Sequence, residues 1–308
     1  MSMGDMCAGQ NMYRPGYELD VCVSATSANL GVGFDVLGLA LGLTARFSFA
    51  RADELEIVGC PAQYQGTDNL VWTSYCTGCA ALGHTPSKLR IAIDSDIPTS
   101  GGLGSSSTCV VAGLVAAQLL HGLSYDPKLT LELALALEGH PDNVAPAILG
   151  GLVSTFVEEG KAYPIRRDVD PTLRFIAIAP PYQVRTEDAR KVIPEHIPTN
   201  TAIWQMGRCV ATVEALATGN LELLSRAAHD RLHEPFRAAL IPDFERLKAC
   251  AYASDAAAFL ISGSGATMLA ITDVARTPKL EETLKHEAPA AWIKTLAADP
   301  HGVRFHTL

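Results

Sequence analysis

Alternating apolar and polar positions predict the first strands of this chain. Apolar residues recur at Leu19, Val21 and Val23, which is the period of a strand with one buried face. We expect this strand to stop at the polar run of residues 24–29. The same reasoning predicts further strands in the first half of the chain at residues 37–49, 57–58 and 89–93.

Longer apolar segments with clear ends predict the helices of the first half. Residues 70–82 follow Asn69, a residue type that caps helices, and precede Gly83, a common helix terminator. Residues 108–120 are apolar on nearly every side, which indicates a buried helix. A third helix is expected at residues 129–137.

The second half of the chain follows a cluster of charges and prolines at residues 160–171. Strands and helices mix there without a regular βαβ repeat, so we expect an α+β fold. The expected strands are residues 173–179, 259–261 and 267–271, and the expected helices are residues 202–217 and 221–229.

The length of the chain and the break near residue 160 predict two domains. The chain has 308 residues, and a domain takes roughly 150. We expect an N-terminal extension at residues 1–18, a first domain at residues 19–165 and a second at residues 166–308.

Composition and charge exclude several classes of function. The chain has 24 Lys and Arg against 33 Asp and Glu, a net charge of −9, which disfavours nucleic acid as a partner. The longest apolar run, residues 110–123, contains Gln118 and His121 and is too short for a membrane helix, so we expect no membrane association. The N-terminus lacks a signal-peptide pattern, and the eight cysteines are scattered, so reduced thiols and a cytoplasmic location are expected.

A glycine- and serine-rich segment is the strongest candidate for chemistry. Residues 97–108 read Ile-Pro-Thr-Ser-Gly-Gly-Leu-Gly-Ser-Ser-Ser-Thr and lead directly into the expected buried helix. Glycines let backbone N–H groups approach an anion, and a helix N-terminus adds unpaired donors and partial positive charge. The segment matches neither the Walker A nor the dinucleotide-binding pattern. A simple capping loop is the alternative interpretation.

The segment resembles the phosphate loop of the GHMP small-molecule kinases. Further segments in sequence order narrow the resemblance to the branch of that family that phosphorylates homoserine, and the match runs from about residue 19 to 271. The chain departs from the family pattern at Ala266, where proline is usual. The supporting segments are residues 25–35, 138–146, 231–237 and 261–265.

This resemblance implies a two-domain architecture and a reaction. The expected domains are an N-terminal one of the ribosomal S5 domain 2 type and a ferredoxin-like C-terminal one, with nucleotide and substrate between them. The implied reaction is ATP-dependent phosphorylation of the side-chain hydroxyl of L-homoserine, on the route to threonine, with Mg²⁺ as the metal. The sequence does not fix the oligomeric state, and a homodimer is kept as an open expectation.

The resemblance assigns the nucleotide and metal contacts. Ser106 and Glu132 resemble the magnesium ligands, and Asn69 resembles a contact to the nucleotide base. Capping a helix is an equal alternative for Asn69, and an exposed helix acid is the alternative for Glu132. The complete set of expected ATP contacts is Asn69, Pro98, Thr99, Ser100, Gly101, Gly102, Leu103, Gly104, Ser105, Ser106 and Ser107.

The resemblance also assigns the acceptor site. Arg190 and Arg237 match arginines that bind a carboxylate, for which a guanidinium fork is suited. Asp35 lies in an otherwise apolar run, where a carboxylate needs a partner such as an ammonium group. The expected substrate contacts are Asn29, Asp35, His140, Asn143, Arg190 and Arg237, of which Asn143, Asp35 and Arg190 are the catalytic candidates.

Asn143 stands where related kinases place an aspartate base. An amide has no protonation equilibrium to offer, and phosphoryl transfer needs little early deprotonation of the alcohol. We therefore expect that no side chain must act as a general base.

Two alternatives to this function stay open: a family member acting on another alcohol such as mevalonate, and a non-catalytic ligand sensor with the same fold.

Overall fold

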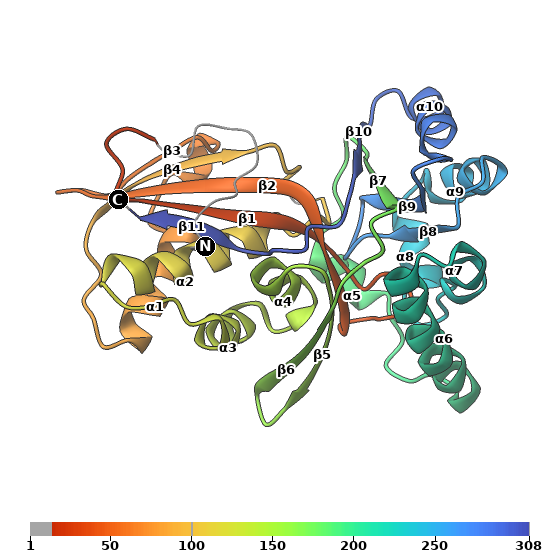
Figure 1. Ribbon diagram of the computed structural model, residues 1–308, viewed down its shortest axis with the longest axis horizontal. Coiled ribbons are helices and arrows are strands. Elements are labelled where there is room, and N and C mark those ends of the chain that lie inside the picture. Colours follow the sequence, from red (N-terminus) through yellow and green to blue (C-terminus); the bar gives the residue numbers. More distant parts are fainter. Residues whose placement is uncertain (1–13, 100, 308) are drawn as a thin grey trace.

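The computed structural model describes residues 14–99 and 101–307, which form two sheets with helices packed against them (Figure 1). Within these residues the first sheet has seven strands in the order β11-β1-β2-β4-β3, with β5 joined to β2 and β6 joined to β5. Its strands are β1 (Leu19–Ala28), β2 (Leu37–Arg51), β3 (Glu56–Val58), β4 (Leu89–Ser95), β5 (Leu152–Glu158), β6 (Lys161–Arg167) and β11 (Arg304–Thr307).

Four helices lie on one side of the first sheet (Figure 1). The central one, α2, is buried along nearly its whole length, as its all-round apolar sequence predicts, and contacts α1 and β1. It begins at Ser105, three residues earlier than expected. The helices are α1 (Leu70–Ala81), α2 (Ser105–Leu120), α3 (Pro127–Glu138) and α4 (Pro141–Leu149), and a short turn η1 (Ala62–Tyr64) precedes α1.

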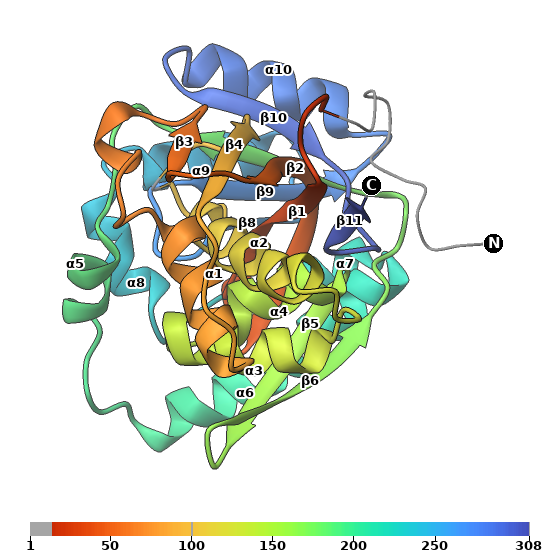
Figure 2. The ribbon, with the colours of Figure 1, turned by 90° about the vertical axis from the view of Figure 1, so that its left-hand side faces the viewer.

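The second sheet has four strands within the described residues, in the order β10-β7-β9-β8, all antiparallel. Two helices, α9 and α10, close a separate apolar core on one face, and α10 lies along β10 (Figure 2). The strands are β7 (Leu173–Ala179), β8 (Ala258–Ile261), β9 (Met268–Asp273) and β10 (Trp292–Leu296). The helices of this half are α5 (Thr186–Lys191), α6 (Thr199–Thr218), α7 (Leu221–Ala227), α8 (Glu234–Arg237), η2 (Ala238–Leu240), α9 (Phe244–Ala253) and α10 (Thr277–Glu287).

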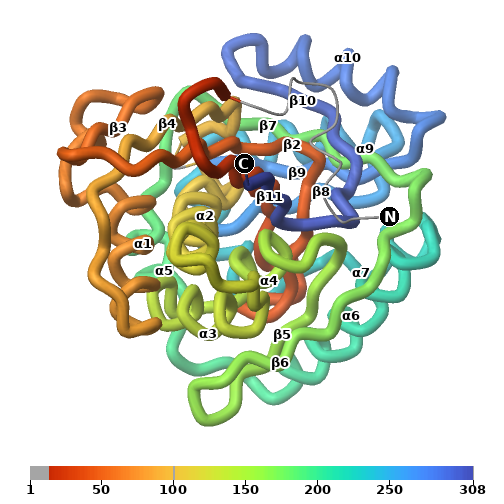
Figure 3. The backbone as a smooth tube through the Cα atoms, turned by 60° about the vertical axis from the view of Figure 1, so that its left-hand side comes forward, coloured from red at the N-terminus to blue at the C-terminus, as the bar shows by residue number. Residues whose placement is uncertain are grey.

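The predicted α+β, two-part architecture is confirmed, but the chain crosses between the parts twice. β6 ends at Arg167, so the expected division after residue 165 lies inside a strand of the first sheet. The C-terminal segment then returns, and β11 pairs with β1 from Leu19↔Thr307 onward (Figure 3). Most of the expected N-terminal extension, residues 1–13, lies outside the described residues.

The first strand is longer than predicted because its polar residues find partners far along the chain. β1 continues from Ser24 to Ala28 instead of stopping, and every residue of the strand is buried. The Ser24 hydroxyl donates to Asp299 and that of Thr26 donates to Asn143. Burying these hydroxyls is therefore compensated by hydrogen bonds that no local pattern reveals.

Several elements were not expected, among them the strands β5, β6, β10 and β11 and the helices α4, α5, α8, α9 and α10. Residues 141–149 form α4, with Pro141 at its first turn, where proline's missing N–H costs nothing. Among the described helices, none combines the length and apolar character that crossing a membrane requires.

Candidate active site

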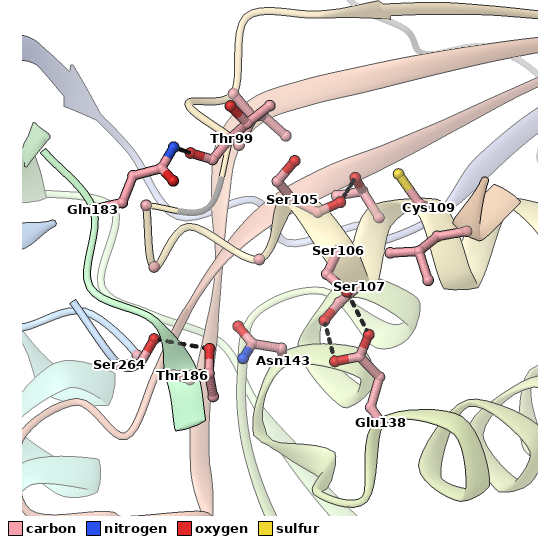
Figure 4. A pocket seen from close by; sticks show the side chains of 18 of the residues that line it. Thr99, Ser105, Ser106, Ser107, Cys109, Glu138, Asn143, Gln183, Thr186 and Ser264 are labelled. Carbon is pink, nitrogen blue, oxygen red and sulfur yellow. Dashed lines mark hydrogen bonds between the residues drawn. The ribbon is translucent and has the colours of Figure 1, made fainter. Parts of the chain in front are cut away.

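A cavity of about 740 Å³ lies where the two sheets meet. One end is formed by the glycine-rich loop and the start of α2 (Figure 4). The other end is formed by charged side chains from both halves of the chain. The turn after β8 also reaches it, through Gly263 and Ser264. The cavity therefore joins the two regions that the sequence analysis assigned to nucleotide and acceptor.

The glycine-rich loop packs so closely against its neighbours that two of its glycines leave no room for a side chain. Gly102 has a φ of +89°, and a Cβ there would lie 2.3 Å from the Ser262 carbonyl oxygen. Gly104 has a φ of +68°, and a Cβ there would lie 2.0 Å from the Thr26 hydroxyl. Since α2 begins directly after Gly104, its first N–H groups lie at the cavity and form an anion-binding end.

Most of the expected nucleotide residues line this cavity. Pro98 and Leu103 do not, and Leu103 is fully buried beneath the loop, where its carbonyl accepts from Thr26 N at 3.1 Å. Ser100 lies outside the described residues. The expected residues that line the cavity are Asn69, Thr99, Gly101, Gly102, Gly104, Ser105, Ser106 and Ser107.

Asn69 serves as the cap of α1. Its Oδ1 accepts from Val71 N at 2.9 Å, and its Nδ2 donates to the Tyr64 carbonyl at 2.6 Å. Both ends of the amide are thus used by the backbone, which favours the capping interpretation over a side-chain contact to the base.

The carboxylate beside the loop is Glu138, not Glu132. The Ser106 hydroxyl donates to Glu138 Oε1 at 2.8 Å, and the Ser107 hydroxyl lies 3.4 Å from Oε2 (Figure 4). Glu132 lies earlier on α3, and it is not among the described residues that line the cavity. The structure therefore does not bring the expected pair of Ser106 and Glu132 together.

Ser106 and Glu138 have the chemistry of a magnesium site. Mg²⁺ takes oxygen ligands, commonly one or two from the protein with the rest from water and phosphate. A hydroxyl and a carboxylate at the start of α2 match that preference. Ser106 and Glu138 therefore fit Mg²⁺, while Glu132 as its ligand stays a prediction from the resemblance.

At the acceptor end, Asp35 and Arg190 form a two-pronged ion pair. Arg190 Nη1 and Nη2 each donate to Asp35 at 3.0 Å, and both side chains are partly exposed. Asp35 has a φ of +57°, and its N–H donates to Asn29 Oδ1 at 3.0 Å, which holds this turn. Asn29 Nδ2 donates in turn to the Gly263 carbonyl at 2.8 Å. Asn29 thus links the turn that carries Asp35 to the turn after β8 in the second sheet.

Arg237 is the buried positive charge of the site. It is 2% exposed, its Nε donates to the Ala189 carbonyl and its Nη1 to the Gly263 carbonyl, each at 3.0 Å. Burial, and then the nearby Arg190, lower the pKa of this guanidinium. The Phe34 ring lies 5.1 Å from Arg237 Cζ and 5.7 Å from Arg190 Cζ, so both arginines belong to one end of the cavity.

His140 is held by an acid that the sequence analysis missed. Its Nδ1 lies 2.8 Å from Asp142 Oδ1, and this hydrogen bond raises the pKa of His140 against the opposing effect of burial. Asp142 is 2% exposed and lines the cavity. The spacing of His140 and Asp142 across Pro141 was the available signal, because it places both at the start of a helix.

The structure brings the six expected acceptor residues to this one cavity. Asn143 lies between its two ends, on the first turn of α4, and accepts a hydrogen bond from Thr26 at Oδ1. The six residues are Asn29, Asp35, His140, Asn143, Arg190 and Arg237.

Comparison with known proteins identifies relatives over most of the chain. Residues 69–151 match the GHMP kinases N terminal domain, and residues 212–294 match the GHMP kinases C terminal domain. Homoserine kinase from Clostridium beijerinckii is 41% identical over 259 residues, covering 83% of this chain and 86% of that enzyme. Homoserine kinase from Nostoc punctiforme is 35% identical over 303 residues, covering 93% and 97%. The crystal structure of homoserine kinase from Cytophaga hutchinsonii matches at a TM-score of 0.85 and 27% identity, covering 97% of this chain and 100% of that one.

Proposed function

The chain belongs to the GHMP kinase family, and we propose that it transfers the γ-phosphoryl group of ATP to the side-chain hydroxyl of L-homoserine. It is a phosphotransferase with an alcohol as acceptor and ATP as co-substrate. The product, O-phospho-L-homoserine, belongs to amino-acid biosynthesis, on the route to threonine. The supporting observation is a single cavity with an anion-binding helix start at one end and two arginines, Arg190 and Arg237, at the other.

The phosphates of ATP fit the end formed by the loop and α2. Backbone N–H groups and the helix dipole stabilise negative charge there without a lysine. A chain of net charge −9 needs such a local source of positive potential to bind phosphates. We propose that Ser106 and Glu138 hold Mg²⁺ at this end. When bound, the ion offsets charge that develops on the transferred phosphoryl group.

The charges of homoserine match the ion pair at the other end. Its carboxylate fits Arg237 and Arg190, and its ammonium group fits Asp35. A solvent-accessible pair such as Asp35–Arg190 contributes only about 0–1 kcal/mol, so a zwitterion that supplies both opposite charges can open it at little cost. The side-chain hydroxyl then points toward Asn143 and His140.

In the reaction, the homoserine oxygen forms a bond to the γ-phosphorus while the bond from that phosphorus to the leaving oxygen of ADP breaks. The hydroxyl proton passes to a phosphoryl oxygen, so no side chain has to accept it first. The main contribution to catalysis is the positioning of the two substrates by the loop, Asn143 and the two arginines.

The alternatives fit the site less well. Mevalonate has a carboxylate but no ammonium group, so it offers Asp35 no charge to replace Arg190. A non-catalytic sensor has no use for Ser106 and Glu138 facing the phosphate end. A cytoplasmic location and a homodimer stay predictions of the sequence.

The test is a coupled assay of ADP release with homoserine, threonine, serine, mevalonate and galactose. Homoserine is expected to have the highest kcat/KM, and removal of Mg²⁺ is expected to stop turnover. Faster turnover of mevalonate or galactose would refute the substrate, and no ADP release with any alcohol would refute the activity.

A further inference from the structure

A buried hydroxyl lies directly behind Asn143. Thr26 is fully buried in β1, and its hydroxyl donates to Asn143 Oδ1 at 2.7 Å. A primary amide has one oxygen that accepts and one nitrogen that donates two hydrogens. With Oδ1 bound by Thr26, the Nδ2 group is the end of the amide left for the cavity, into which Figure 4 shows the side chain of Asn143 directed.

The pair of Thr26 and Asn143 lies directly beneath the phosphate end. A Cβ on Gly104 would lie 2.0 Å from Thr26 Oγ1 and 3.2 Å from Asn143 Oδ1, so the loop is in contact with both side chains. The Thr26 N–H also donates to the Leu103 carbonyl at 3.1 Å, which fixes the loop to the same residue. Thr26 therefore sets the position of the loop through its backbone and the direction of the amide through its side chain.

We propose that Thr26 is a positioning residue that fixes the Asn143 amide with its N–H groups toward the reacting oxygens. This inference rests on the kinase function proposed above. A donor in that place stabilises negative charge on the phosphoryl oxygens as the bond to ADP breaks. An amide in the opposite orientation would place a carbonyl oxygen against the same charge. In the structure the Thr26 hydroxyl donates to Oδ1 and so holds the amide in the first of these two orientations.

Neighbouring hydroxyls of β1 provide a comparison within the same strand. Ser24 is also fully buried, and its hydroxyl donates to Asp299, away from the described residues that line the cavity. Removing this hydroxyl disturbs β1 to a similar degree without touching Asn143. A change in turnover that is specific to Thr26 therefore reports on the amide and not on general damage to the strand.

The experiment compares Thr26→Val, which keeps the shape and loses the hydroxyl, with Thr26→Ser, which keeps the hydroxyl. Leaving the Asn143 oxygen unpaired is expected to lower kcat about 10- to 100-fold in Thr26→Val, while KM for both substrates changes less than about threefold. Thr26→Ser and Ser24→Ala are expected to keep kcat within about threefold of the parent. In the Asn143→Ala background, Thr26→Val is expected to cause no further loss, because it acts through that amide.

Parental kcat in Thr26→Val would overturn the proposal, and so would a loss that persists undiminished in the Asn143→Ala background. Failure of Thr26→Ser to restore turnover, or an equal loss in Ser24→Ala, would also overturn it. If circular dichroism finds Thr26→Val unfolded, Thr26→Ala is judged by the same criteria. If the parent prefers another alcohol, the proposed substrate fails, and the same variants assayed with that alcohol still decide the role of Thr26.

Discussion

The two ends of the cavity are built in different ways. The phosphate end uses the described residues of one segment, 97–99 and 101–108, whose glycines and helix start present backbone N–H groups. The acceptor end uses side chains from separate elements: Asp35 follows β1, His140 precedes α4, Arg190 lies on α5 and Arg237 on α8. Binding by backbone N–H groups survives many side-chain substitutions but not added volume in the loop. Binding by side chains is weakened whenever one of the charged residues is lost.

The largest effect is expected where a side chain does contribute to the phosphate end. Glu138→Gln should lower kcat roughly 100- to 1000-fold, the range for losing one group that stabilises developing charge. The matched control is Glu132→Gln on the same helix, which should keep parental kcat because that side chain does not reach the cavity. Both are measured at saturating ATP with varied Mg²⁺. The reverse outcome would restore Glu132 as the ligand.

In the glycine-rich loop, adding a side chain should destabilise the fold because no volume is available for it. Gly104→Ala should lower the free energy of unfolding by about 3 kcal/mol, since it adds left-handed strain to a clash with Thr26. Gly122→Ala is the control: this residue also has a left-handed φ, +74°, but a Cβ there meets nothing within 4 Å. It should cost only about 1 kcal/mol. Urea denaturation measures both, and equal losses would contradict the tight packing under the loop.

At the acceptor end, loss of a charge should act on binding of one substrate. Arg237→Ala should raise KM for homoserine roughly 10- to 100-fold, because a charge-assisted hydrogen bond contributes about 1.5–3 kcal/mol. Arg190→Ala should raise it less, since that side chain is more exposed. KM for ATP should stay nearly constant in both variants. An equal rise for ATP would mean that the two ends are not independent.

The smallest effect concerns pH. Asp142 raises the pKa of His140, so the folded protein favours the protonated imidazole. The resulting stabilisation is complete below the ordinary pKa of about 6.5 and is lost as pH rises through the higher folded value. The parent should therefore exceed His140→Gln in unfolding free energy more at about pH 5 than at about pH 9. A difference that grows with pH would contradict the assignment.

Local pattern predicted those elements whose own sequence is strongly apolar. The expected strand of residues 173–179 is observed without change as β7, and the apolar helix is observed as the buried α2. The predicted first strand ends too early because polar residues such as Ser24 and Thr26 are typical of loops. Their partners, Asp299 and Asn143, are more than a hundred positions away, so burial of these hydroxyls leaves no local signal.

The same distinction explains where the structure differs from the expected site. The glycine-rich loop is continuous and could be found by its motif, whereas the acid beside it had to be chosen between two glutamates of one helix. Glu138 is selected by the packing of the end of α3 against the start of α2, which sequence spacing alone does not determine. Asp142 was missed because its role is exerted through His140.

The pairing of β11 with β1 has a consequence for synthesis of the protein. β1 leaves the ribosome long before β11, the strand that pairs with its outer edge, because Leu19 and its partner Thr307 are 288 positions apart. At roughly 5–20 residues per second, that edge stays open for tens of seconds. An open strand edge invites pairing with other chains. During that interval the edge of β1 that later pairs with β11 can pair with another chain.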